Sequence, residues 1–312
     1  MTSRRRIGLP QLLPAAVSAG ILYWLLRGVD LLAVAAAVNA RVATVMVPAL
    51  VGFCAATLWI EALSINSLLL SPPPSFGLWT AARIKCASYL PALIHYTLGL
   101  GGLAVLLRRR TGLSLGEALG LVLLISTTDL IVALAAAGTS AAVLGVGERG
   151  VRTGLVAFVI AAFFGGIALV RTPAPLGVLE RVRALSIFEG LRRVPLGRLA
   201  ELLTLRALFS ACFVAGCASA FVAFEIPAPP ARLIGGIMLV ALVAALPIAV
   251  AGLGTSQAAL VYLFKDLAPA ERLLAMSLVL SFGIIALRTA MGVCFARELT
   301  REALHDARTA PV

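Results

Sequence analysis

The stretch "LPIAVAGLGTSQAALVYLF", residues 246–264, places a proline, two glycines and three polar residues inside one of the most apolar parts of the chain. Pro247 removes a backbone donor, and Gly252 and Gly254 free the backbone from helical geometry. A backbone polar group set free in lipid is costly unless protein or water satisfies it. We therefore expect a broken helix that lines a protein-walled or wet cavity. The alternative is a kinked packing helix whose glycines allow close approach.

Three polar residues, Thr255, Ser256 and Gln257, follow this break directly. They would begin the second half-helix, which Thr or Ser can cap. The exposed amides and the positive end of the helix dipole suit an anionic group such as a phosphate. Together with Gly252 and Gly254, these residues form a predicted headgroup site.

The composition indicates an all-α polytopic membrane protein. Of 312 residues, 61% are hydrophobic and 13% are charged, whereas soluble domains carry about 25% charged residues. Apolar runs of about 20 residues, enough to cross a hydrocarbon core of about 30 Å, recur along the chain. We expect about eight membrane segments. Single spans are predicted at 11–31, 43–63, 115–137, 153–170, 203–224 and 273–296, and the longer segments 76–107 and 231–264 are broken by proline and glycine.

The net charge of +12 sits in short basic clusters that flank the apolar spans. We attribute it to the positive-inside bias and not to nucleic-acid binding. The clusters predict that both termini are cytoplasmic, that 76–107 enters and leaves from the cytoplasm, and that 231–264 does so from the other side. Each would be a re-entrant hairpin, the first broken at Pro91. The alternative is that each long segment crosses the membrane once or twice.

Two halves with opposite orientation follow from this topology, as in the inverted repeats of many transporters. The first repeat is expected at 1–144 and the second at 145–296, followed by a short cytoplasmic tail at 297–312. The basic, amphipathic stretch 171–202 would be a connector that lies along the cytoplasmic surface.

Charged residues inside the apolar segments are the next candidates for a site. Asp129 and Arg288 lie near the middle of the last span of each half, where a lone charge costs at least about 2.5–3.5 kcal/mol on insertion scales. Either they pair with each other, or Arg288 binds a lipid phosphate that Asp129 orients. Arg83 and Lys85 enter the first hairpin, where they bind headgroups or extend to the interface.

No metal or cofactor site is expected, because the five cysteines are scattered in apolar context and only two histidines are present. His95, just after Pro91, is a weaker candidate for substrate binding. Glu61 and Glu117 lie near span ends and are expected to be solvated.

The stretch 246–264, followed by a last span with Arg288, resembles the lysylphosphatidylglycerol synthase transmembrane, or flippase-like, family. "ARIKCASYLPALIHYTLGLGGLAVLLRRRTGLSLGEAL" at 82–119, with Asp129 downstream, resembles the first half of its pattern. The resemblance implies an integral inner-membrane protein connected with translocation of lipids or polyisoprenoid-linked lipids. Bifunctional members carry a soluble synthase domain that this sequence lacks, so we expect no synthase activity.

Family members often carry an acidic residue a few positions after each Leu-Pro. Here those positions read His95-Tyr96 and Gln257. A cationic aminoacyl headgroup would lose its carboxylate partners, which favours a neutral or anionic headgroup.

The leading hypothesis is a non-enzymatic lipid translocator that handles a phospholipid or a polyisoprenoid-linked lipid. No Gly-x4-Gly-Lys motif is present.

 That motif binds ATP phosphates. Without it, movement would be downhill, ion-coupled or driven by a partner.

Two other hypotheses remain open. A membrane-embedded lipid-modifying enzyme would need acid–base or metal-binding groups, and no His/Asp/Glu cluster accompanies Asp129. A non-transporting accessory or scaffold subunit in envelope lipid synthesis would instead bind a lipid-synthesis partner protein. The expected partners of the translocator are membrane lipids with an anionic headgroup, which the basic clusters also attract.

Overall fold

The structure is a computed structural model that describes residues 39–143, 188–245 and 254–309 and parts of 157–172. The span predicted at 11–31, most of the span at 153–170, and the break residues Pro247 and Gly252 lie outside the described residues. Every regular element in the described parts is a helix, which confirms the all-α prediction.

Four helices are long and apolar enough to cross a membrane: Ala40–Leu68, Leu115–Ser140, Leu196–Ala223 and Ala270–Phe295. They confirm the single spans predicted at 43–63, 115–137, 203–224 and 273–296. The described helices are α3 (Ala40–Leu68), α4 (Leu78–Ile94), α5 (Tyr96–Thr111), α6 (Leu115–Val143), α9 (Glu189–Arg193), α10 (Leu196–Ala223), α11 (Pro230–Ala245), α12 (Thr255–Phe264) and α13 (Ala270–Thr309). Because α10 begins at Leu196, the end of the predicted connector 171–202 forms its first turns.

The predicted segment 76–107 is a hairpin of two short helices, α4 and α5. The break falls at His95, four residues after Pro91, because Pro91 is accommodated in the last turn of α4. The two helices approach closely: a Cβ on Gly99 would lie 2.5 Å from the Cβ of Ala92, and one on Gly102 would lie 3.0 Å from Cγ of Pro91. Glycine at these positions therefore lets the hairpin close.

The predicted segment 231–264 also forms two helices, α11 and α12, that pack together. The beginning of α11 lies beside the end of α12, since Arg232 Nη2 donates to the carbonyl of Leu263 at 3.0 Å. Gly236 lies so close to the ring of Phe264 that a side chain there would clash. Both broken segments are thus hairpins.

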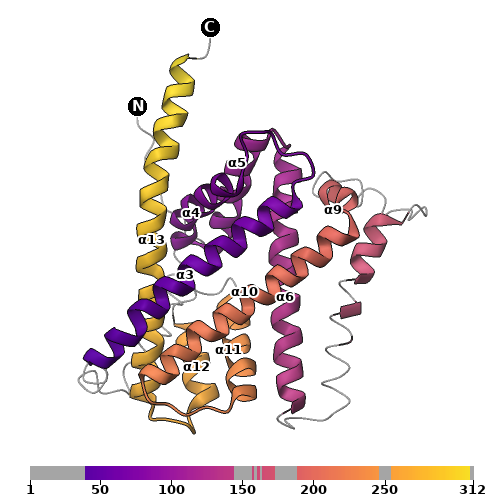
Figure 1. Ribbon diagram of the computed structural model, residues 1–312. Helices are drawn as coiled ribbons and strands as arrows, with labels where there is room; N and C mark the ends of the chain where they lie inside the picture. The colour runs from indigo at the N-terminus through magenta and orange to yellow at the C-terminus, as the bar shows by residue number, and fades with distance from the viewer. Residues whose placement is uncertain are drawn as a thin grey trace, which may run out of the picture.

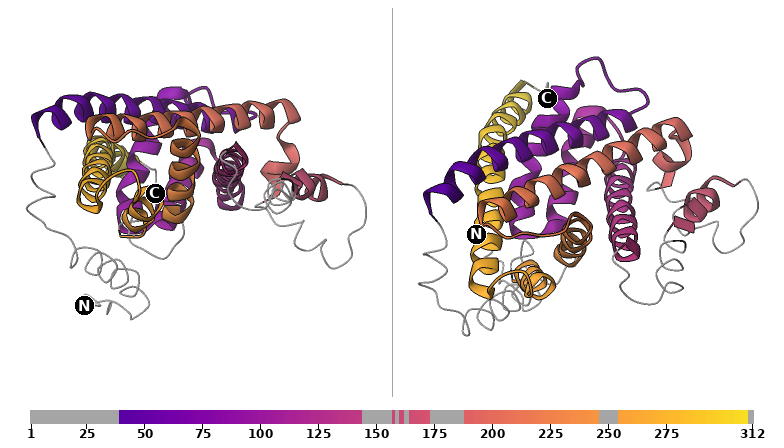
Figure 2. Two further views of the ribbon diagram at one scale, coloured as in Figure 1. Left: turned by 90° about the horizontal axis from the view of Figure 1, so that it is seen from below. Right: turned by 60° about the horizontal axis from the view of Figure 1, so that its bottom comes forward.

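Among the described helices, α3 and α10 make the most extensive contact, and they lie side by side across one face of the other helices (Figure 1, Figure 2). They run in opposite directions. Arg41 at the beginning of α3 pairs with Glu225 after α10, while the rings of Phe53 and Phe213 pack 5.9 Å apart further along.

The same order of elements occurs twice: a long helix, a hairpin and a second long helix. In Figure 1 the helices α6 and α13 run in opposite directions on either side of the hairpins. The helix α4 packs on α13, and α11 packs on α6. Each hairpin is therefore held against the last long helix of the other set.

Candidate functional site

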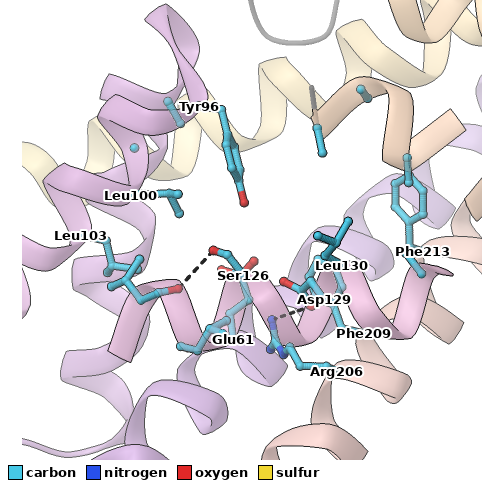
Figure 3. A pocket seen from close by; sticks show the side chains of 18 of the residues that line it. Glu61, Tyr96, Leu100, Leu103, Ser126, Asp129, Leu130, Arg206, Phe209 and Phe213 are labelled. Carbon is cyan, nitrogen blue, oxygen red and sulfur yellow. Dashed lines mark hydrogen bonds and ion pairs between the residues drawn. The ribbon is translucent and has the colours of Figure 1, made fainter. Parts of the chain in front are cut away.

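Two adjoining cavities lie where the hairpins meet the long helices. Their volumes are about 370 Å³ and about 310 Å³, within or close to the usual range of ligand sites, about 300–1,000 Å³. The larger cavity is lined by residues of α3, α4, α5, α6, α10, α11 and α13 (Figure 3). Tyr89, Tyr96, Phe213 and Arg288 line both cavities and so form the wall between them.

Five charged residues line the larger cavity: Glu61, Lys85, Asp129, Arg206 and Arg288. Lys85 forms an ion pair with Glu61, and the two side chains are only 18% and 12% exposed. The prediction that Glu61 is solvated is therefore wrong, because α4 packs on α3 and brings a lysine against it. Lys85, for which headgroup binding or extension to the interface was expected, lines the cavity with its charge already paired.

Arg206 on α10 is the buried partner of Asp129. Its side chain is 0% exposed, and Nη1 lies 3.5 Å from Oδ1 of Asp129, as Figure 3 shows. Nη2 donates to Oγ of Ser64 at 2.6 Å and to the carbonyl of Ile60 at 3.3 Å. The expected pair of Asp129 with Arg288 is not formed, because the crossing of α3 and α10 places Arg206 beside α6.

Arg288 has a different environment. Its guanidinium lies over the rings of Tyr89 and Phe53, 5.1 Å and 6.0 Å from their centres. Among the described residues it has no ion pair with a carboxylate, and its Nε is buried without a hydrogen-bond partner. It lies closer to the end of the apolar part of α13, at Phe295, than to its beginning.

Gln257, whose side chain is 0% exposed, caps the beginning of α12. Its Oε1 accepts from the backbone N of Gly254 at 2.6 Å and from Oγ of Ser256 at 3.1 Å. Its Nε2 donates to Oγ of Ser281 at 3.0 Å. Gly254 has a φ of +90°, a conformation that favours glycine. Gln257 therefore stabilises the beginning of α12 and ties it to α13.

The remaining predicted residues differ in position. Ser256 and His95 line the smaller cavity. His95 also caps α5, since its Nδ1 accepts from the backbone N of Thr97 at 3.3 Å. Gly254, Thr255 and Arg83 are not among the described residues that line either cavity. The helix beginning at Thr255 thus contributes to the wall of the smaller cavity through Ser256 and Leu260.

The described residues hold no group of three or more His, Cys, Asp and Glu side chains that could bind a metal ion. The family model described as the lysylphosphatidylglycerol synthase TM region matches residues 11–292. This chain belongs to that family. It is therefore a membrane protein of a family connected with lipid-related processes. Searches of curated proteins and of solved structures found no match.

That Arg206, Glu61 and Tyr89 line the larger cavity was not predicted from the sequence. Arg206 falls within the span predicted at 203–224 but was not singled out, although apolar residues flank it on both sides in "LLTLRALFSACFV". That context was the available signal that Arg206 lies inside the span. No sequence pattern linked Glu61 to Lys85, because the pairing depends on how α3 packs against α4.

Proposed function

We propose that this protein is an integral membrane lipid translocator that holds the headgroup of a phospholipid or polyisoprenoid-linked lipid in the two cavities. The observation that carries the proposal is Arg288 on the wall that both cavities share, a cation without a carboxylate partner among the described residues. Such an uncompensated charge within apolar helices is costly and is typical of a substrate site. The adjoining cavities give a headgroup two places to occupy.

The arrangement of the helices supports an inverted repeat as the basis of this function. The two sets of elements run in opposite directions, and each hairpin packs on the last long helix of the other set. In inverted-repeat transporters the substrate lies at the repeat interface, and one repeat moves against the other. We place the protein in the inner membrane with both termini cytoplasmic, as the positive-inside bias favours.

The test is reconstitution of the purified protein in liposomes that contain lipids labelled on an acyl chain. Dithionite added outside bleaches only the outer leaflet, so loss of the protected fluorescence reports translocation. We expect the wild type to move lipid. Arg288→Ala removes the headgroup contact, and Gly254→Leu puts a side chain at φ +90°, so both should abolish movement.

Failure of the folded wild type to move any phospholipid or polyprenyl-phosphate probe would contradict the proposal. A folded, inactive protein that co-purifies with a lipid-synthesis enzyme would instead identify an accessory subunit. A metal-dependent activity that a chelator removes would identify an enzyme.

A further inference from the structure

The charges of the larger cavity do not cancel. Its lining includes three basic residues, Lys85, Arg206 and Arg288, and two acidic residues, Glu61 and Asp129. Lys85 pairs with Glu61, and Arg206 pairs with Asp129. Among the described residues that line the cavity, one positive charge, on Arg288, is left over.

The smaller cavity shows the same imbalance. Among the described residues that line it, Arg288 is the one lysine, arginine, aspartate or glutamate, and His95 is the other basic group. A cationic headgroup in this cavity would find no carboxylate. A phosphate would find a guanidinium, which binds phosphate oxygens through several N–H donors.

Tyr89 supplies a second donor at the same place. Its hydroxyl is buried and has no hydrogen-bond partner among the described residues, and Nε of Arg288 is likewise unsatisfied. The aromatic faces of Tyr89 and Phe53 hold the guanidinium without neutralising its charge. Unsatisfied buried donors are rare in proteins, because each costs free energy. Two of them on one wall point to an anion that satisfies both.

The larger cavity also reaches an apolar surface. Tyr96 and Leu130 line it, yet they are 49% and 47% exposed. They lie on α5 and α6, helices that also expose Leu98 and Leu123. In a membrane protein such a surface faces acyl chains. The mouth of the cavity therefore suits an amphiphile whose tails remain in the bilayer.

We propose that the site selects a lipid with a phosphodiester headgroup of one net negative charge, and that Arg288 and Tyr89 bind its phosphate oxygens. A zwitterionic or aminoacylated headgroup adds a cation. The two carboxylates that line the larger cavity, Glu61 and Asp129, cannot receive it because they already pair with Lys85 and Arg206. A phosphomonoester brings more charge than Arg288 balances. This assignment rests on the proposed function for its lipid-handling role, but binding tests it without transport.

The experiment measures displacement of acyl-labelled phosphatidylglycerol from the purified full chain in detergent micelles. The competitors share the same acyl chains and are phosphatidylglycerol, phosphatidylcholine, lysylphosphatidylglycerol and phosphatidic acid. Because the other three lipids carry either a cation that finds no free carboxylate or a second negative charge, we expect phosphatidylglycerol to compete at least about tenfold better than each of them. Equal competition by the zwitterionic lipid would overturn the assignment.

Variants locate the selectivity. Arg288→Gln should remove the preference, and Tyr89→Phe should weaken the binding of phosphatidylglycerol by about threefold to tenfold, as loss of one hydrogen bond predicts. Arg272→Gln is the matched control, because Arg272 lies on the same helix and is exposed. Full preference in a folded Arg288→Gln protein would overturn the assignment. If that variant does not fold, the wild-type lipid series and Tyr89→Phe still decide it.

Two further comparisons distinguish a lipid from a water-soluble ligand, and the binding site from the translocator function. Deacylated glycerophosphoglycerol tests for a water-soluble ligand, and competition equal to that of the lipid would overturn the lipid assignment. Selective binding without movement in liposomes would support this site while contradicting the translocator. Movement of all lipids without selective binding would do the reverse.

Discussion

Arg206 and Arg288 are both arginines inside long apolar helices, but their surroundings differ. Arg206 is 0% exposed and contacts a carboxylate, a hydroxyl and a backbone carbonyl. Arg288 lies on aromatic rings at the wall of two cavities and has no carboxylate partner among the described residues. The first arginine joins α3, α6 and α10, whereas the second leaves its charge available.

This comparison teaches that a buried arginine does not by itself indicate a function. A paired charge stabilises one arrangement of helices against its alternatives, because breaking the pair leaves an uncompensated charge. An unpaired charge costs free energy in the folded protein and is expected where a ligand repays that cost. The environment of each arginine, and not its position in the sequence, separates the two roles.

The largest expected effect comes from Arg206→Met. It leaves Asp129 without its partner, so we expect a loss of about 3–5 kcal/mol in the free energy of unfolding. Thermal or denaturant unfolding in detergent measures it. The double variant Arg206→Met/Asp129→Leu removes both charges and should recover most of the loss. An unchanged melting temperature in the single variant would show that the two arginines do not differ as described.

The next effect concerns the hairpin that carries Tyr89 to Arg288. Gly99→Ala places a Cβ 2.5 Å from that of Ala92, so overpacking should cost about 1–3 kcal/mol. Gly101→Ala is the matched control on the same helix, because nothing lies within 4 Å of its new Cβ. Unfolding of both variants is compared. Equal stability would mean that the hairpin closes without this contact.

Arg288→Met should change stability by less than about 1 kcal/mol, since it orphans no carboxylate and removes mainly a cation–π contact. The contrast with Arg206→Met under the same unfolding conditions is the measurement. A loss as large as that of Arg206→Met would show that Arg288 is structural, and the headgroup site would then lose its main support.

The smallest effect is expected at an ion pair far from both arginines. Arg232 donates to Asp266 in the turn before α13, with Nη1 2.5 Å from Oδ2. This hydrogen bond lowers the pKa of Asp266 below its ordinary value of 3.8. Because the folded-state pKa is the lower one, the stabilisation is present above pH 3.8 and is lost as pH falls through the folded pKa.

Asp266→Asn should therefore remove the small fall in melting temperature that the loss of this ion pair causes in acid. For this ion pair, the melting temperature of the variant should be the same near neutral pH as in acid. Melting curves of both proteins between acid and neutral pH measure this difference. The carboxylate is exposed, so solvent screening keeps the effect small. Identical pH dependence in the two proteins would contradict it.

Much of the helical framework was predictable from the sequence. Apolar runs of span length gave the positions of α3, α6, α10 and α13, because membrane-spanning helices need about 20 apolar residues. Proline, glycine and charge clusters marked the segments that form the two hairpins. The break near Pro91 falls at His95, since proline is tolerated within the last turn of α4.

The candidate site was predictable only in part. Asp129, Lys85 and Arg288 were singled out as charges in apolar context, and all three line the larger cavity. Their partners were not foreseen: Arg206 comes from α10 and Glu61 from α3. Gln257 was assigned to a headgroup site, yet its amide is engaged with Gly254 and Ser281.

The sequence by itself determined the membrane class, the family, the long helices and the two broken segments, because hydropathy, helix breakers and charge are local properties of the chain. Only the tertiary structure decided which charges are paired and which is left over. Ion pairs such as Arg206 with Asp129 join residues far apart in the chain, so they depend on how the helices cross. The charge left on Arg288 is the consequence of that packing.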